Sequence, residues 1–131
     1  MRNVRNKKAI VAGLALLAVG ALQTPAFATG HSSSRGETIT VRGSGTYVSS
    51  VTTTRTPHAF KDKAHLILRD SSNHYRQELR GWTDTNNYQN KDYRTWSIKQ
   101  HVPNGWRVCA EWWGYGYKHP FKGMPCVIVH K

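Results

Sequence analysis

The chain has 131 residues, with 19 basic against seven acidic side chains, for a formal net charge of +12. This length suits one compact domain rather than several. The charge favours association with anionic polymers, but no run of five or six basic residues occurs, so a solvated basic surface is an equal alternative to a dedicated site.

The first 28 residues are predicted to be a secretory signal peptide. Four basic residues open it, the apolar run 9–22 follows, and Ala26, Phe27 and Ala28 supply the small-x-small pattern of a signal-peptidase site. The apolar run is shorter than the roughly 20 residues that a membrane-spanning helix needs. Cleavage after Ala28 removes the four basic residues and no acidic one, so the secreted chain carries +8 instead of +12. An uncleaved N-terminal anchor is the alternative.

The remainder of the chain has the pattern of strands. Residues 29–36 are rich in glycine and serine and are expected to form a flexible tail, followed by a single β domain over 37–131. Seven segments show alternation or β-branched composition: 37–41, 46–54, 64–69, 75–82, 93–101, 106–113 and 126–130. A short amphipathic helix is the alternative for 75–82, because Gln, Glu, Leu and Arg are good helix formers.

Turn chemistry separates these segments. Glycines at 42–45, short polar side chains at 70–73 and the Asn-Gly pair that ends 102–105 each favour a reversal. Residues 55–63, which contain Pro57, and the asparagine-rich 83–92 are expected to be loops. No long helical period follows the signal-peptide helix, so we predict an all-β fold, a small antiparallel β-sandwich or barrel of about six to seven strands.

The two cysteines are expected to pair. Cys109 and Cys126 are predicted to form a disulfide, because a small secreted domain is normally oxidised; two free thiols are the alternative. The bridge closes a loop that is worth about 3 kcal/mol in the chain-entropy model.

Alternation also predicts which side chains face the core. The inward set is Leu66, Leu68, Trp96, Ile98, Trp106, Val108, Ala110 and Trp112. The opposite face of the strand 106–113 carries Arg107, Cys109, Glu111 and Trp113. The disulfide is therefore not required to lie in the core.

The glycine-rich turn after Trp112 holds the candidate ligand-binding residues. They are Trp113, Tyr115, Tyr117, Lys118, His119, Phe121 and Lys122. Rings on such a turn can stack on sugars or bases or lie at a membrane interface, and the neighbouring cations favour an anionic partner. The competing interpretation is that these rings pack around the disulfide and enlarge a small core.

Motifs for catalysis or metal binding are not found. The histidines show no HExxH and no short pairing with cysteine, no GxSxG is present, and no cofactor is predicted. Glu111 with His101 or His119 and Arg107 supplies the residue types of a small ribonuclease, but Glu111 beside Arg107 is more simply a surface ion pair. We therefore expect no catalytic residues and no enzyme activity.

Two stretches near the C-terminus carry a resemblance. Val102-Pro103-Asn104-Gly105 followed by Val108-Cys109-Ala110-Glu111-Trp112, and then Pro125 to Lys131, resemble the end of uncharacterised small secreted one-disulfide β proteins of Gram-positive actinobacteria. The resemblance covers the signal peptide and about the last thirty residues, and implies secretion and a β fold without an active site. The chain also resembles the lactococcin-972-like bacteriocins in size, charge and β fold, although that family lacks this disulfide and has a Gly-Thr-Trp start.

Together these features predict a small, basic, monomeric secreted protein without enzymatic activity. The expected partner is an anionic cell-envelope polymer or a glycan, and binding of nucleic acid is expected to be non-specific. An antibacterial toxin, a small ribonuclease or other hydrolase, and an enzyme inhibitor are the alternatives.

Overall fold

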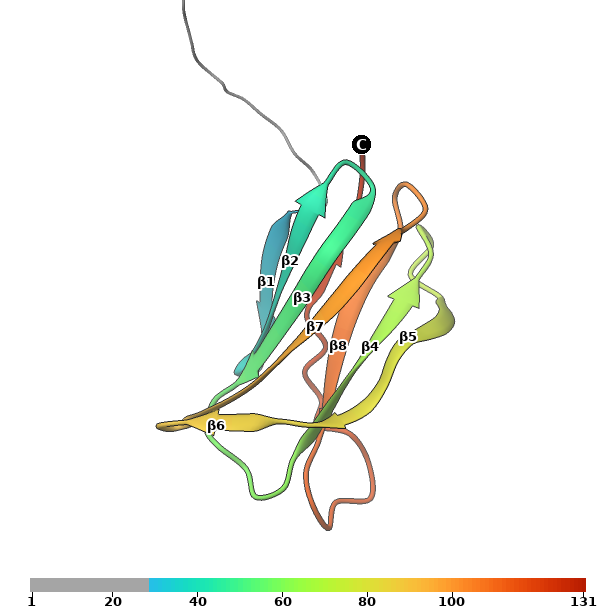
Figure 1. Ribbon diagram of the computed structural model, residues 1–131. Helices are drawn as coiled ribbons and strands as arrows, with labels where there is room; N and C mark the ends of the chain where they lie inside the picture. Colours follow the sequence, from blue (N-terminus) through green and yellow to red (C-terminus); the bar gives the residue numbers. More distant parts are fainter. Residues whose placement is uncertain (1–28) are drawn as a thin grey trace, which may run out of the picture.

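The computed structural model describes residues 29–131, so the predicted signal peptide lies outside the described part of the chain. Within that part, nine strands form two antiparallel sheets that pack as a β-sandwich (Figure 1). They are β1 (Gly30–Ser34), β2 (Glu37–Ser44), β3 (Tyr47–Arg55), β4 (Lys63–Arg69), β5 (Tyr75–Asp84), β6 (Asn86–Tyr88), β7 (Lys91–His101), β8 (Arg107–Trp113) and β9 (Cys126–Ile128). One sheet has the order β1-β2-β3-β7-β6 and the other β5-β4-β8-β9. The predicted all-β fold is confirmed.

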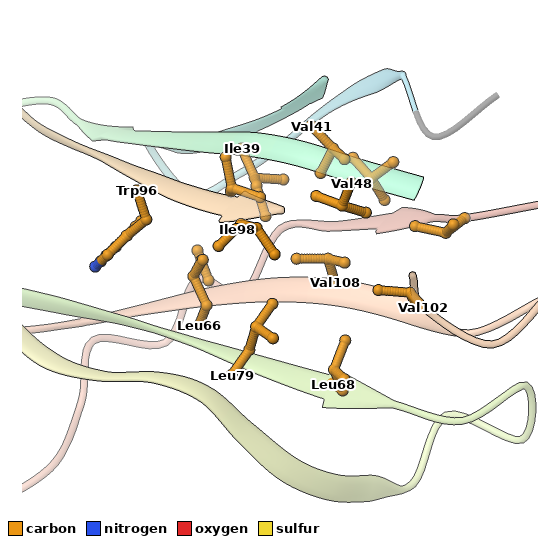
Figure 2. Packing of buried hydrophobic residues seen from close by; sticks show 14 of the residues in the cluster. Ile39, Val41, Val48, Leu66, Leu68, Leu79, Trp96, Ile98, Val102 and Val108 are labelled. Atoms are coloured by element: carbon orange, nitrogen blue, oxygen red, sulfur yellow. The ribbon is translucent and has the colours of Figure 1, made fainter. Parts of the chain in front are cut away.

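The core lies between the two sheets. Figure 2 shows Ile39, Val41 and Val48 of one sheet pointing toward Leu66 and Val108 of the other. All of the predicted inward positions are buried except Trp106, which is partly buried against the same cluster. Burial of these side chains is the main term that holds the sheets together, at roughly 1.5–3 kcal/mol for each large aliphatic residue.

Trp112 is the largest fully buried side chain of the core. Its indole N–H donates a 2.9 Å hydrogen bond to the Thr53 hydroxyl, which itself donates to the Thr38 carbonyl at 2.6 Å. A buried indole needs such a partner. The hydrogen bond therefore ties β8 to β3 across the interior.

The Cys109–Cys126 disulfide is present. The two cysteines are register partners of the antiparallel pair β8 and β9, and Cys109 is fully buried without belonging to the inter-sheet cluster. The bridge thus closes the base of the long loop that begins after Trp113.

The expectation of a flexible tail over residues 29–36 is wrong, because Gly30–Ser34 forms β1. This strand pairs with β2 in register from Gly30 opposite Val41 to Ser34 opposite Glu37. Arg35 and Gly36 join the two strands with φ values of 50° and 81°, as a two-residue hairpin loop requires. Gly30 also packs on Val127, where a Cβ would lie 2.6 Å from a valine methyl. Backbone pairing, which needs no apolar alternation, makes this segment a strand.

The predicted loop over residues 83–92 is mostly strand. β5 extends to Asp84, and the three exposed residues of β6 pair with the start of β7. The helix alternative for 75–82 is wrong, since these residues lie in β5 and pair with β4. Among residues 29–131 no helix is long and apolar enough to cross a membrane.

Candidate functional site

The β3–β4 connector and the β8–β9 loop lie at the same end of the sandwich, at the bottom of Figure 1. Residues of both segments line two adjoining pockets. The ring cleft, of about 310 Å³, is lined by Lys61, Lys63, Trp82, Trp113, Gly114, Tyr115, Gly116 and Tyr117. The polar pocket, of about 490 Å³, is lined by His58, Ala59, Lys61, Asp62, Lys63, Asp84, Thr85, Asn87, Asp92 and Tyr115. Both volumes fall within the range of small-molecule sites, and the pockets share Lys61, Lys63 and Tyr115.

The ring cleft is built from aromatic side chains of three separate segments. Trp82 of β5 meets Trp113 of β8 edge to face, with ring centroids 5.5 Å apart and planes at 77°. Phe60 of the connector meets Tyr115 in the same manner at 5.6 Å. Tyr115 and Tyr117 are 66% and 61% exposed, so their faces remain open to a ligand.

The turn that carries the tyrosines is fixed by local geometry. Tyr117 N–H donates to the Gly114 carbonyl at 3.2 Å, and Gly116 has a φ of 82°. The Trp113 indole N–H donates to the Tyr117 carbonyl at 2.7 Å. A Cβ on Gly114 would lie 2.6 Å from the Phe121 ring, so this position has no room for a side chain. These contacts therefore give the turn a defined conformation, which positions Tyr115 and Tyr117.

The structure brings together only part of the predicted binding set. Trp113, Tyr115 and Tyr117 line the ring cleft. Phe121 instead packs against the core, and the Arg55 guanidinium lies 3.8 Å above its ring. Lys118, His119 and Lys122 belong to the same loop but line neither pocket.

Sequence reasoning missed the opposite wall of the cleft. Lys61 and Lys63 come from or just after the proline-containing connector, and Trp82 lies on β5. Phe60 of the same connector does not line the cleft but contacts Tyr115. The Lys61 ammonium lies 5.4 Å from the Phe60 ring centroid and 5.5 Å from that of Tyr115, while Lys63 pairs with Asp84 at 2.5 Å. One sequence signal could have pointed to this segment, namely an aromatic residue followed by three charged residues in the run Phe60-Lys61-Asp62-Lys63.

His65 lies directly beneath Trp82. The imidazole and indole are stacked with centroids 3.7 Å apart and planes at 9°. His65 Nδ1 is 2.9 Å from Glu78 Oε2, and Nε2 is 2.9 Å from Glu111 Oε1. A carboxylate can only accept, so both ring nitrogens donate and the ring is an imidazolium. We call His65, Glu78 and Glu111 the His65 clamp.

Electrostatics support this assignment. Burial alone would lower the pKa of His65, whose side chain is 10% exposed, but the hydrogen bonds and charges of Glu111 and Glu78 raise the pKa above its ordinary value of 6.5. The clamp also corrects one expectation. Glu111 is bonded to His65 rather than paired with Arg107, which donates to the backbone carbonyls of Asp70 and Ser71.

The four residues of the ribonuclease alternative do not form one constellation. His101 is bonded to the Thr46 hydroxyl and packs on Tyr47, and Glu111 is engaged by the His65 clamp. His119 lies exposed on the β8–β9 loop. His101 and Glu111 are therefore each engaged by other residues of the chain.

Two buried carboxyl groups form the floor of the polar pocket. Asp62 is 3% and Asp92 1% exposed. Asp92 accepts hydrogen bonds from His58 Nδ1 at 2.6 Å, from Ala59 N–H at 2.9 Å and from Asn87 Nδ2 at 3.1 Å. Asp62 accepts from the Thr85 hydroxyl. The pair thus joins the connector to β6 and β7.

The pKa values of the two carboxyl groups are shifted in opposite directions. Burial, followed by the hydrogen bond with Asp92, raises the pKa of Asp62 to about 7. Burial also acts to raise the pKa of Asp92, but the hydrogen bonds from Asp62, Ala59, His58 and Asn87 lower it. Asp62 is therefore protonated below about pH 7, close to an ionised Asp92. Within residues 29–131, no cluster of three His, Cys, Asp or Glu side chains is arranged to hold a metal ion.

Comparisons of the chain with protein-family models, with curated proteins and with solved structures found no match. The case for a function therefore depends on the geometry of the two pockets.

Proposed function

We propose that the protein is a non-enzymatic binder of an anionic or carbohydrate component of a cell envelope, and that the ring cleft is its binding site. The observation that carries the proposal is the gathering of Trp82, Trp113, Tyr115 and Tyr117 with two lysines around one open cleft. Flat rings stack on the faces of sugar rings, and the Lys61 ammonium beside Tyr115 can attract carboxylate or phosphate substituents. The signal peptide expected over residues 1–28 supports a location outside the cytoplasm.

The first experiment separates ring stacking from charge. Calorimetric titration of chain 29–131 with tetra-N-acetylglucosamine, which is neutral, and with tetragalacturonate, which is acidic, would be run at low and moderate salt. Ring-driven binding is expected for both probes, with the acidic probe tighter at low salt and losing that advantage as salt rises. Binding of neither probe would contradict the proposal.

The variant for this experiment combines Trp113→Ala, Tyr115→Ala and Tyr117→Ala. Loss of three stacking rings should weaken binding by more than tenfold, at roughly 1–3 kcal/mol for each ring that contacts the ligand. Tyr88→Ala is the matched control, because Tyr88 is 67% exposed on β6 and lines neither pocket. Equal affinities of the triple variant and the wild type, with the fold intact by circular dichroism, would remove the ring cleft from consideration.

A hydrolase acting on the same ligand class is the second candidate, favoured by Asp62. A carboxyl group with a pKa near 7 beside a pocket is suited to proton transfer. This candidate ranks second because Asp62 is only 3% exposed, which leaves little of its carboxyl group for a substrate to reach. Release of reducing ends from the two tetramers, lost in Asp62→Asn, would favour catalysis; the absence of product with bound tetramer favours the binder.

A further inference from the structure

The wall of the ring cleft is supported from below by a charged group. In the order β5-β4-β8, Trp82 of β5 reaches over the central strand β4 to meet Trp113 of β8. His65 of β4 lies beneath it, with its ring parallel to the indole at 3.7 Å. A cation against the face of an indole is attracted by the ring quadrupole, and Trp is the best partner for this interaction. The orientation of Trp82 therefore depends on the charge state of His65.

The His65 ring has no rotational freedom while it is doubly protonated. One nitrogen is bonded to Glu78 of β5 and the other to Glu111 of β8, each at 2.9 Å. If one proton is lost, a ring lone pair faces a carboxylate oxygen at hydrogen-bonding distance, and that contact becomes repulsive. The ring must then turn or move, and the stacked surface beneath Trp82 changes with it.

We propose that His65 is a positioning residue for the ligand: as an imidazolium held by Glu78 and Glu111 it fixes Trp82, and through Trp82 the Trp113 wall of the ring cleft, so that binding weakens when His65 loses its second proton. The ligand part rests on the proposed function. The part that concerns ring positions does not, since it is measurable without any ligand.

Other ionisable groups lie near the His65 clamp, and their effects on a pH profile must be distinguished from the effect of His65. On β4 the Lys63 ammonium is engaged by Asp84 of β5, and Glu37 of β2 lies within the electrostatic reach of Glu111. Asp62 in the polar pocket gives up its proton near pH 7. The effect of His65 is therefore read as a difference between matched variants.

The experiment has a ligand-free arm and a binding arm. In the first, the ring C–H signals of His65 and the indole N–H signals of Trp82 and Trp113 are followed by NMR from pH 5 to 9. We expect the two indole signals to move with the midpoint of His65, which lies above 6.5. In the second, the affinity for tetra-N-acetylglucosamine is measured over the same range, and should fall by about tenfold across that midpoint, the scale of losing one pre-ordered side chain.

The variant His65→Gln cannot carry the charge, so its affinity should be weak and independent of pH. His101→Gln is the matched control, because His101 is bonded to Thr46 away from the cleft and should reproduce the wild-type profile. Glu78→Gln, at the more exposed carboxylate of the clamp, serves if His65→Gln fails to fold, and should lower the midpoint of both profiles.

The outcomes are distinguishable. Indole signals that ignore the titration of His65, or an equal affinity at pH 6 and 9 once His65 has titrated, would overturn the inference and leave the proposed function standing. Absence of binding at every pH would overturn the proposed function and the ligand part of the inference. The indole signals would still decide whether His65 positions the rings.

Discussion

Two buried ionisable groups of the sandwich, His65 of β4 and Glu37 of β2, differ in their hydrogen-bond partners. His65 has a carboxylate on each ring nitrogen, whereas neither carboxylate oxygen of Glu37 has a hydrogen-bond partner although the residue is 1% exposed. Glu37 is covered by the β8–β9 loop, since a Cβ on Gly123 would lie 2.8 Å from its carboxyl carbon. The Arg55 side chain opposite it donates instead to the Pro57 carbonyl and lies on the Phe121 ring.

The pKa values of Glu37 and His65 are both raised, but for different reasons. Burial raises the pKa of Glu37 to about 8, with Arg55 acting against the shift and Glu111 adding to it, so Glu37 is kept neutral. The two glutamates raise the pKa of His65, so His65 is kept charged. Both groups bind more protons in the folded than in the unfolded chain, and both contributions to stability decline as pH rises. The contribution of Glu37 to stability declines between pH 4.5 and about pH 8, and that of His65 begins to decline at pH 6.5.

The largest effect is expected from Glu37→Gln. The variant cannot ionise, so it escapes the cost that the wild type accumulates between pH 4.5 and 8. Urea unfolding should show the variant gaining on the wild type by roughly 2–4 kcal/mol over this range. Glu78→Gln is the matched control, because Glu78 is 44% exposed and no such gain is expected there. A difference between Glu37→Gln and wild type that stays constant from pH 4 to 8 would show that Glu37 is ionised in the fold.

The next effect is the loss of the His65 clamp. His65→Ala leaves Glu78 and Glu111 without their shared cation and removes the ring beneath Trp82. The expected cost is about 2–3 kcal/mol at pH 6, less than for a fully buried ion pair because both glutamates reach solvent. The cost should shrink as the pH rises through the midpoint of His65, which lies above 6.5, because the wild type then loses the imidazolium itself. His101→Ala, measured in the same denaturation series, is expected to change stability by less than about 0.5 kcal/mol.

The sequence predicts those parts of this structure whose signals are local. Alternation in 64–69 and 93–101 places Leu66 and Ile98 inside correctly. Two cysteines in a chain with an expected signal peptide are enough to predict the Cys109–Cys126 bridge. β1 and β6 were missed because they are held by backbone pairing at sheet edges, where serine and asparagine serve as well as valine.

The His65 clamp could not be predicted by the same reasoning. Its three members are 13 and 46 positions apart along the chain, and only the register of β4 with β5 and β8 brings them together. The ring cleft is an intermediate case. The glycine-rich turn with Tyr115 and Tyr117 is visible as a motif, but Trp82 and Lys61 reach it from segments whose placement depends on the fold.

The smallest effect on stability is expected from replacing either carboxylate of the His65 clamp. Glu111 is 28% and Glu78 44% exposed, so the two carboxylates make the same 2.9 Å contact with His65 in different degrees of solvent. Replacement by glutamine keeps an oxygen acceptor and removes the charge. We expect a cost of about 1 kcal/mol for Glu111→Gln and about 0.5 kcal/mol for Glu78→Gln at pH 6, because screening by water weakens the more exposed pair. Glu111→Gln should also lower the pKa of Glu37, on which Glu111 acts, whereas Glu78→Gln should leave it unchanged. NMR titration of the Glu37 carboxyl carbon in both variants tests this, and equal shifts in the two would mean that the charge of Glu111 does not raise the pKa of Glu37.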